Sequence, residues 1–361
     1  MSERILSRLA FATILMGALT VPCLAADRIG TAGPIRSFGG TTCNAGIVAV
    51  MRGECDPPPV DSALAPEQRS QARVERAREL LSIPRLDQAI RELDTAIADD
   101  PRNSVALLLR GRLKISTRVD EAIADMDRVL QLDPDNSSAH ATKAFVLRGQ
   151  NDEWALAEAT KALAQDPRNA DAFWIRASVL ADLGKLTEAE QDLNAAIALE
   201  PDVSRALLRR AEIRAQMGKT DDAVRDASAV LALGRDSIAL QLRAVIRGRS
   251  GDYAGALDDL NAILGPPEER RDAPIHPFMV DMYVQRALAL TRTGQVADAR
   301  RDLDTIIQLG GPRAVLQMQI YLRGHGFPDL ALDGKRSDQL DDALTACFIN
   351  DACGRGIAIP G

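Results

Sequence analysis

A fixed period through the middle of the chain limits what it can fold into. Four acid–proline steps follow one another at intervals of 33, 33 and 34 residues: Asp100-Pro101, Asp133-Pro134, Asp166-Pro167 and Glu200-Pro201. The clearest copy, residues 169–201, has the pattern of a helix, a turn at Gly184 and a second helix. Because one helix pair cannot bury its apolar face alone, this period predicts helix pairs that stack on their neighbours.

The repeat resembles the tetratricopeptide repeat. That family's pattern is a bulky residue, a small residue within the first helix, a glycine at the turn, alanines on the second helix and a closing proline. In this chain the pattern is matched in order by Phe173, Ala177, Gly184, Ala189, Ala196 and Pro201. The resemblance implies an all-α fold, a right-handed solenoid of helix-turn-helix repeats, with a small helical module at the C-terminal end.

Seven copies can be aligned over residues 67–312. Small residues at the helix crossing let the two axes approach closely. On the first helices they are Ala77, Gly111, Ala144, Ala177, Ala211, Ala244 and Ala287. On the second helices they are Ala89, Ala122, Ala155, Ala189, Ala223, Ala256 and Ala299. The pattern is weakest near Thr117 and Asn151, where the turn is one residue short, and at Arg235, where the closing proline is missing.

Each copy also carries a basic residue just before its first small position. These are Arg76, Arg110, Lys143, Arg176, Arg210, Arg243 and Arg286. Fifteen or sixteen residues later the second helix carries an acid: Glu92, Asp125, Glu158, Asp192, Asp226, Asp259 and Asp302. We expect each base to pair with an acid of its own or the adjoining unit and so to fix the stacking register. The alternative is a basic strip that grips an acidic ligand.

The resemblance implies that partners bind the concave surface, which the first helices line. By helical phase, the binding candidates on this surface are Arg112, Phe145, Trp174, Ser178, Leu208, Glu212, Gln241 and Val284. Phe145 and Trp174 are the expected anchors, because large rigid side chains dominate such contacts. The alternative is that both rings only fill space between repeats. The repeated lysine and asparagine with which some relatives clamp a terminal carboxylate are missing, so that activity is not inferred.

The N-terminal residues 1–25 have the pattern of a secretory signal. Arg4 and Arg8 precede an apolar run from Leu9 to Val21, and small residues precede Ala26. The sequence therefore predicts export, to the periplasm of a bacterium, with no stable membrane span after cleavage. An uncleaved anchor helix is the alternative. Residues 26–66 are rich in glycine and proline, which indicates a linker-like segment. A second proline-rich stretch, residues 265–278, predicts a loop between the sixth and seventh units.

Four cysteines lie outside the signal: Cys43, Cys55, Cys347 and Cys353. An even number in an exported chain suggests disulfides. Three connectivities are open, and we expect the local one, Cys43 with Cys55 and Cys347 with Cys353. Metal binding is the alternative, but no histidine is close to either pair and the spacings do not match those of zinc sites.

The last segment, residues 313–361, resembles the small three-helix peptidoglycan-binding-like module of envelope proteins, with Asp333 and Gly334 as the turn between helices. The plainer interpretation is that this segment caps the apolar end of the array.

Composition argues against two other classes of function. The formal net charge is -7, so nucleic acid is not an expected partner. The three histidines are scattered, and no phosphate loop, metal motif or nucleophile motif is present, so we expect no enzyme, no metal and no cofactor. Two hypotheses remain. One is an exported scaffold that binds a protein or peptide on its concave face, in cell-envelope assembly. The alternative is a cell-wall protein that binds peptidoglycan through its C-terminal module, with the repeats as a spacer.

Overall fold

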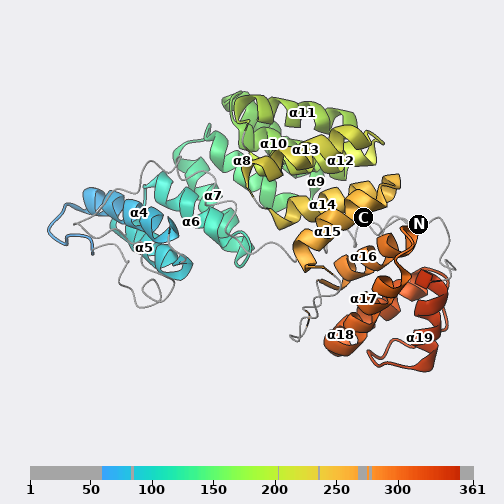
Figure 1. Ribbon diagram of the computed structural model, residues 1–361. Helices are drawn as coiled ribbons and strands as arrows, with labels where there is room; N and C mark the ends of the chain where they lie inside the picture. The colour runs from blue at the N-terminus through green and yellow to red at the C-terminus, as the bar shows by residue number, and fades with distance from the viewer. Residues whose placement is uncertain are drawn as a thin grey trace. The chain divides into compact units, whose positions relative to one another are not determined.

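The computed structural model describes residues 59–82, 85–201, 203–234, 236–266, 275 and 279–349, and within them every regular element is helical (Figure 1). The chain divides after Val203 into two compact units. The predicted signal, most of residues 26–66, and Cys43, Cys55 and Cys353 lie outside the described residues. Within the described ranges, no helix is both long and apolar enough to cross a bilayer.

The first unit contains four helix pairs up to Val203. They are α4 (Pro66–Ser82) with α5 (Leu86–Asp99), α6 (Ser104–Lys114) with α7 (Val119–Leu132), α8 (Ser137–Leu147) with α9 (Asp152–Gln165), and α10 (Ala170–Asp182) with α11 (Leu186–Leu199). Each helix packs most extensively on its own partner, and consecutive pairs also contact one another.

The second unit begins at Ser204 and contains three more pairs. They are α12 (Ser204–Gln216) with α13 (Thr220–Leu233), α14 (Ser237–Ser250) with α15 (Tyr253–Leu264), and α16 (Val280–Arg292) with α17 (Val296–Leu309). Then come α18 (Gly311–Gly324), α19 (Asp338–Leu344) and the π-helical turn η2 (Thr345–Ile349). The seven predicted helix pairs are therefore confirmed, including the two with a short turn.

The small residues lie where the sequence predicts, at the crossing of each pair. The seven alanines of the second helices are at most 3 % exposed. On the first helices the same holds for the six alanines, and Gly111 is buried as well. A Cβ on Gly111 would overlap the end of Met126 and press on Asp125, both on α7. Side-chain size at this position therefore sets how closely α6 approaches α7.

Helix starts also tie successive pairs together. The Asn103 side chain caps α6 by accepting from the Ala106 amide at 3.0 Å, and its Nδ2 donates to Ser70 Oγ at 2.8 Å. Ser70 Oγ in turn donates to the Ala96 carbonyl at the end of α5, at 2.7 Å. The same three-way link recurs two units later through Asn169 and Ser137. One asparagine thus satisfies a helix N-terminus and fixes the stacking of the preceding pair.

The C-terminal helices close the apolar end of the second unit. Met318 and Leu322 of α18, Leu340 of α19 and Phe348 of η2 are almost fully buried in one core with residues of α16 and α17. This packing is that of a cap on the last repeat. Cys347, also buried here, is disulfide-bonded, and every other cysteine lies outside the described residues. Its pairing with Cys353 stays a prediction.

A buried glutamine holds the loop between α18 and α19. Gln319, which has no exposed surface, accepts from the Asp333 and Gly334 amides at 3.1 and 2.8 Å. Its Nε2 donates to Asp333 Oδ1 at 2.9 Å and to the Lys335 carbonyl at 3.1 Å. Gly334 has a φ of 68°, a conformation that glycine adopts without strain.

We predict that Gly334→Ala destabilises the second unit more than Gly294→Ala does. Both glycines have positive φ, 68° and 82°, so both variants incur roughly 1–2 kcal/mol of backbone strain. Only at Gly334 would the new Cβ also overlap backbone atoms of Pro312; at Gly294 it meets nothing within 4 Å. Urea unfolding of the two variants measures the difference. Equal losses of stability would contradict the tight approach of Pro312.

Candidate functional site

A row of ion pairs, here called the spine, joins the two helices of most units. Arg76 pairs with Glu92 in the first unit of the row. In the others both carboxylate oxygens accept from one guanidinium: Arg110–Asp125 (2.9 and 2.5 Å), Arg176–Asp192 (2.7 and 2.8 Å), Arg210–Asp226 (2.9 and 2.7 Å), Arg243–Asp259 (3.0 and 2.5 Å) and Arg286–Asp302 (2.7 and 2.6 Å). Six of the seven predicted pairs are confirmed.

The third unit departs from the prediction. Lys143 donates to Asp127 of the preceding helix α7 at 2.7 Å rather than to Glu158. Glu158 instead lies 2.6 Å from His140 Nδ1 and accepts from Lys161 at 2.9 Å. An ammonium lacks the planar fork of a guanidinium and does not bind both oxygens of one carboxylate side by side. Lys143 therefore pairs with an acid of the adjoining unit, which the expectation allowed, and not with Glu158 of its own unit.

The spine is structural rather than a ligand strip. Asp125, Asp192, Asp226, Asp259 and Asp302 are all at most 7 % exposed. The hydrogen bonds that Arg176 donates to Asp192 raise the pKa of Arg176, and those that Arg243 donates to Asp259 raise the pKa of Arg243. Each guanidinium donates to a carboxylate of its own unit, and Arg110 and Arg243 also donate to Asp94 and Ser228 of the preceding unit. These arginines are therefore engaged before any ligand arrives.

We predict that Asp302→Asn lowers the free energy of unfolding by about 3–5 kcal/mol, because it leaves the Arg286 charge buried and uncompensated. The side chains of Arg286 and Asp302 are 3 % and 2 % exposed. The control is Asp298→Asn, which removes an exposed pair with Arg301 and should cost about 0–1 kcal/mol. Replacing both spine partners, Arg286→Met with Asp302→Leu, should recover part of the loss. Urea unfolding measures all three, and equal losses for Asp302→Asn and Asp298→Asn would contradict the structural role.

We predict that Glu158 stabilises the fold at neutral pH and loses this contribution in acid. Burial by itself would raise its pKa, but hydrogen bonds from His140 and Lys161 hold it below its ordinary value of 4.5. A carboxyl with a lowered folded-state pKa stabilises the fold above its unfolded pKa and loses that contribution as pH falls through the folded value. Glu158→Gln should therefore be less stable than the wild type at neutral pH and converge with it in acid. Urea midpoints across pH test this; a constant difference would contradict it.

The binding candidates fall on both units. Arg112 on α6, Phe145 on α8 and Trp174 on α10 are partly exposed in the first unit. Leu208 and Glu212 on α12 and Gln241 on α14 are partly exposed in the second. Ser178 and Val284 were expected at the surface but are only 0 % and 5 % exposed, because neighbouring side chains cover them. As placed in the structure, these two contribute almost no surface to a partner.

Three predicted residues come together on the first helices of the first unit. The rings of Phe145 and Trp174 are stacked, with centroids 5.7 Å apart and planes inclined by 26°. Arg148 lies over the Phe145 ring, 5.7 Å from its centroid, and 3.7 Å from Asp182. Arg112 reaches Thr142 Oγ1 at 3.3 Å and lies 3.9 Å from Asp171. We call these seven residues the aromatic face: Arg112, Thr142, Phe145, Arg148, Asp171, Trp174 and Asp182.

Four members of the aromatic face escaped the sequence prediction. Thr142, Arg148 and Asp171 lie three residues from a predicted ring, so they share its side of the helix. Asp182 is eight residues beyond Trp174 at the end of α10. The i±3 spacing was a usable signal for the first three, whereas the Asp182 contact depends on how neighbouring repeats stack.

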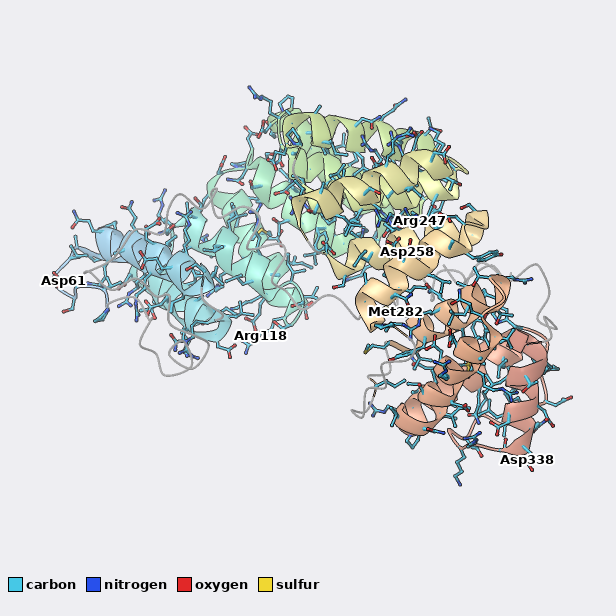
Figure 2. All side chains as sticks on the ribbon, in the orientation of Figure 1. Asp61, Arg118, Arg247, Asp258, Met282 and Asp338 are labelled. Atoms are coloured by element: carbon cyan, nitrogen blue, oxygen red, sulfur yellow. The ribbon has the colours of Figure 1, made fainter. Side chains whose placement is uncertain are left out.

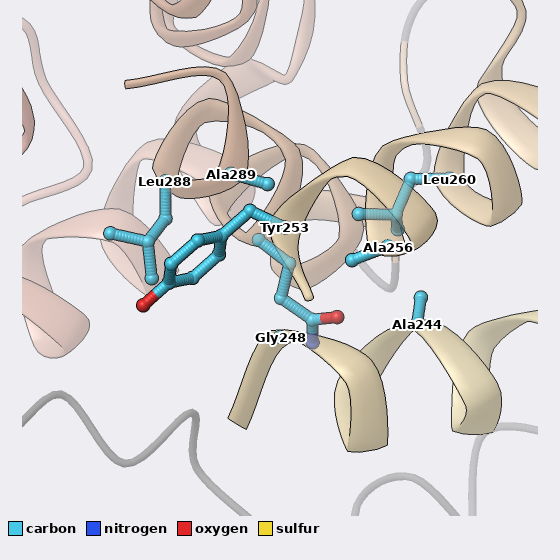
Figure 3. A pocket seen from close by; sticks show the side chains of 8 residues that line it. Ala244, Gly248, Tyr253, Ala256, Leu260, Leu288 and Ala289 are labelled. Carbon is cyan, nitrogen blue, oxygen red and sulfur yellow. The ribbon is translucent and has the colours of Figure 1, made fainter. Parts of the chain in front are cut away.

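The second unit offers a different surface. Glu212 accepts from Arg209 at 2.8 Å. Between α14, α15 and α16 lies a cavity of about 10 Å³, lined among others by Gly248, Tyr253 and Leu288 (Figure 3). Gln285 also lines it, and its Oε1 is buried with no hydrogen-bond partner. This volume is about that of one water molecule, so the cavity is too small for a peptide side chain. Figure 2 shows how densely side chains cover the helices elsewhere.

Paired helices of this length, with small residues at each crossing and ion pairs within each unit, define a helical-repeat protein. The tetratricopeptide repeat family model matches residues 74–137 and 147–204. These two segments are therefore similar to tetratricopeptide repeats, and they include Arg112 and Trp174 but not Phe145. This fold is typical of scaffolds without catalytic activity, and the described residues show no catalytic arrangement. A search of curated proteins found no match.

Solved structures share the fold. PilW, described as a widely conserved type IV pilus biogenesis factor, is similar over 56% of this chain and 96% of its own, at 22% identity and a TM-score of 0.50. A tetratricopeptide repeat protein from Parabacteroides merdae is similar over 67% of this chain and 94% of its own, at 20% identity and a TM-score of 0.46. PilF of Pseudomonas aeruginosa is similar over 56% of this chain and 94% of its own, at 16% identity and a TM-score of 0.47. At 22% identity the likeness to PilW shows the fold alone.

Proposed function

We propose that this chain is an exported scaffold that binds a protein or peptide partner on the aromatic face. The observation that carries the proposal is the stacked, partly exposed pair of Phe145 and Trp174 on the first helices of adjacent repeats. Large aromatic side chains supply much contact area at little conformational cost, which is why they dominate protein interfaces. The tetratricopeptide match covers Trp174, and Phe145 lies between its two segments, which supports a scaffold of the kind that binds peptides.

Export and a cell-envelope role rest on the N-terminal sequence. Arg4 and Arg8, the apolar run from Leu9 to Val21 and the small residues before Ala26 form the signal pattern. We propose that the mature chain acts in the periplasm, in envelope assembly. The likeness to PilW and PilF is compatible with this role, but it extends to the fold only. Cell-wall binding through residues 313–361 has less support, because the helices there are buried as a cap.

We predict that Trp174→Ala reduces partner capture at least about tenfold, the change expected when an interface anchor is truncated. The measurement is a crosslinking pulldown of the tagged chain from its native envelope, read by mass spectrometry. The matched control is Trp154→Ala: Trp154 is 65% exposed on α9, a second helix, and stands outside the aromatic face.

Thermal unfolding of both tryptophan variants should first show that each is folded at the assay temperature. Capture that is equally strong with Trp174→Ala and with the wild type would overturn the proposal, whatever partner is recovered. Equal loss in both variants would also count against the face as the specific site.

A further inference from the structure

His140, on α8, is a buried histidine whose two ring nitrogens both meet acceptors. The residue is 8 % exposed. Its Nδ1 lies 2.6 Å from Glu158 Oε2 on α9, and its Nε2 lies 3.0 Å from the Pro134 carbonyl oxygen in the loop before α8. An ionised carboxylate and a carbonyl have no proton to donate, and a neutral imidazole donates from one nitrogen only. Both contacts are therefore hydrogen bonds only when the ring carries two protons and a positive charge.

The first repeat makes the equivalent contact with a permanent cation. Arg73 occupies the position in α4 that His140 occupies in α8, four residues before the small residue of the helix crossing. Arg73 Nη1 donates to Glu92 at 3.0 Å, and Glu92 is the second-helix acid equivalent to Glu158. A guanidinium stays charged, whereas histidine changes its charge between about pH 5 and 8. Of these two ion pairs, the one in the third repeat is thus the one that titrates in this range.

The remaining repeats support a cationic role for His140. At the equivalent position they have apolar or aromatic residues: Leu107, Phe173, Leu207, Leu240 and Tyr283. On their second helices these five repeats carry aspartate, whereas the first and third repeats carry the longer glutamate, as Glu92 and Glu158. A basic side chain at this position and a glutamate across from it therefore occur together in this chain.

Glu158 is the charged group in contact with the His140 ring. Its other oxygen accepts from Lys161, also on α9, at 2.9 Å. Charged groups on the other elements packed against α8 have partners elsewhere: Asp127 with Lys143, Asp133 with Asn136, Asp135 with Gln165, Arg112 with Thr142, Asp171 with Arg112, and Asp182 with Arg148. The charge of the ring is therefore set against one carboxylate, which it shares with an exposed lysine.

We infer that the third repeat is a proton-sensitive element, in which His140 is held as an imidazolium between its two acceptors and its deprotonation loosens α8 and the aromatic face. When one proton leaves as pH rises, one acceptor loses its donor, which weakens the packing of α8. Ala141, the next residue, lies in the same core as Phe145 and Trp174, so the change reaches both rings. The regulation of partner binding rests on the proposed function, whereas the proton-dependent contact does not.

Nuclear magnetic resonance of the full chain, with nitrogen-15 in its histidines, tests the protonation of His140. Its signals are those missing from His140→Leu, which copies Leu107, Leu207 and Leu240. At about pH 5.5 both ring N–H protons should be visible, because hydrogen bonds protect them from exchange with water, and one should be lost by about pH 8. His325 is the internal control and should show at most one such proton, because only its Nδ1 has a contact among the described residues, with the Tyr321 carbonyl at 2.7 Å.

Urea unfolding measures the effect on stability. The unfolding constant of His140→Leu relative to the wild type should be largest at about pH 5.5 and fall at least about threefold by about pH 8, roughly the contribution of one hydrogen bond. His140→Arg copies Arg73 of the first repeat and should show no such change relative to His140→Leu. His325→Leu is the matched control and should change by less than about twofold over the same range.

Trp174 reports whether the change reaches the aromatic face. The chain contains two tryptophans, so Trp154→Phe leaves Trp174 as the only indole. In that variant the Trp174 emission should shift to longer wavelength between about pH 5.5 and 8, as the ring becomes more exposed to water. Adding His140→Leu should abolish this pH dependence.

Three outcomes would overturn the inference. One is a His140 ring with a single protected proton throughout the pH range. Another is a stability ratio between His140→Leu and the wild type that does not change with pH. The third is Trp174 emission that depends on pH equally with and without His140, which would separate the histidine from the aromatic face. Failure of the proposed function would be seen separately, as partner capture that does not depend on Trp174.

Discussion

The close crossing of two helices within each unit is the contact on which the rest of the structure depends. Alanine or glycine occupies both sides of that crossing, and nearly all of these residues are completely buried. Because the axes approach closely, an arginine on the first helix can reach an aspartate fifteen or sixteen residues later on the second. A larger residue at Ala177, for example, would push the axes apart and lengthen the Arg176–Asp192 contact with them.

The spine has arginine at six of its seven basic positions. A buried ion pair adds little net stability, but it disfavours registers in which either charge would be left alone. That role needs a cation whose donors match both oxygens of a carboxylate, as the guanidinium does. The third unit has lysine in place of arginine at this position, and its ion pairs differ. Lys143 turns to Asp127 of the preceding unit, and His140, one turn earlier on α8, takes the carboxylate that lysine leaves.

The sequence predicted what depends on period and residue size, and it missed what depends on how repeats stack. The helix pairs, the crossings and six spine pairs follow from spacing within one unit. The hydrogen bond from Asn103 to Ser70 joins different units, so no pattern within one unit predicts it. Ser178 and Val284 were placed at the surface by helical phase alone, yet neighbouring side chains cover both. The unpartnered Gln285 Oε1 beside its small cavity depends on three helices and has no sequence signature.

The burial of Ser178 is consistent with the stacking of Phe145 on Trp174. Within the repeat, Ser178 is equivalent to Phe145, and Ala141 is equivalent to Trp174, so each ring has a small residue at the equivalent position of the neighbouring first helix. Ala141 and Ser178 are 1 % and 0 % exposed, and Ala141 lies in the same core as both rings. Two large side chains at equivalent positions would compete for the same space. The large and the small residue occur in opposite order on the two helices, so both rings have room to stack. Ser178 thus supports the surface by its size rather than by contacting a partner.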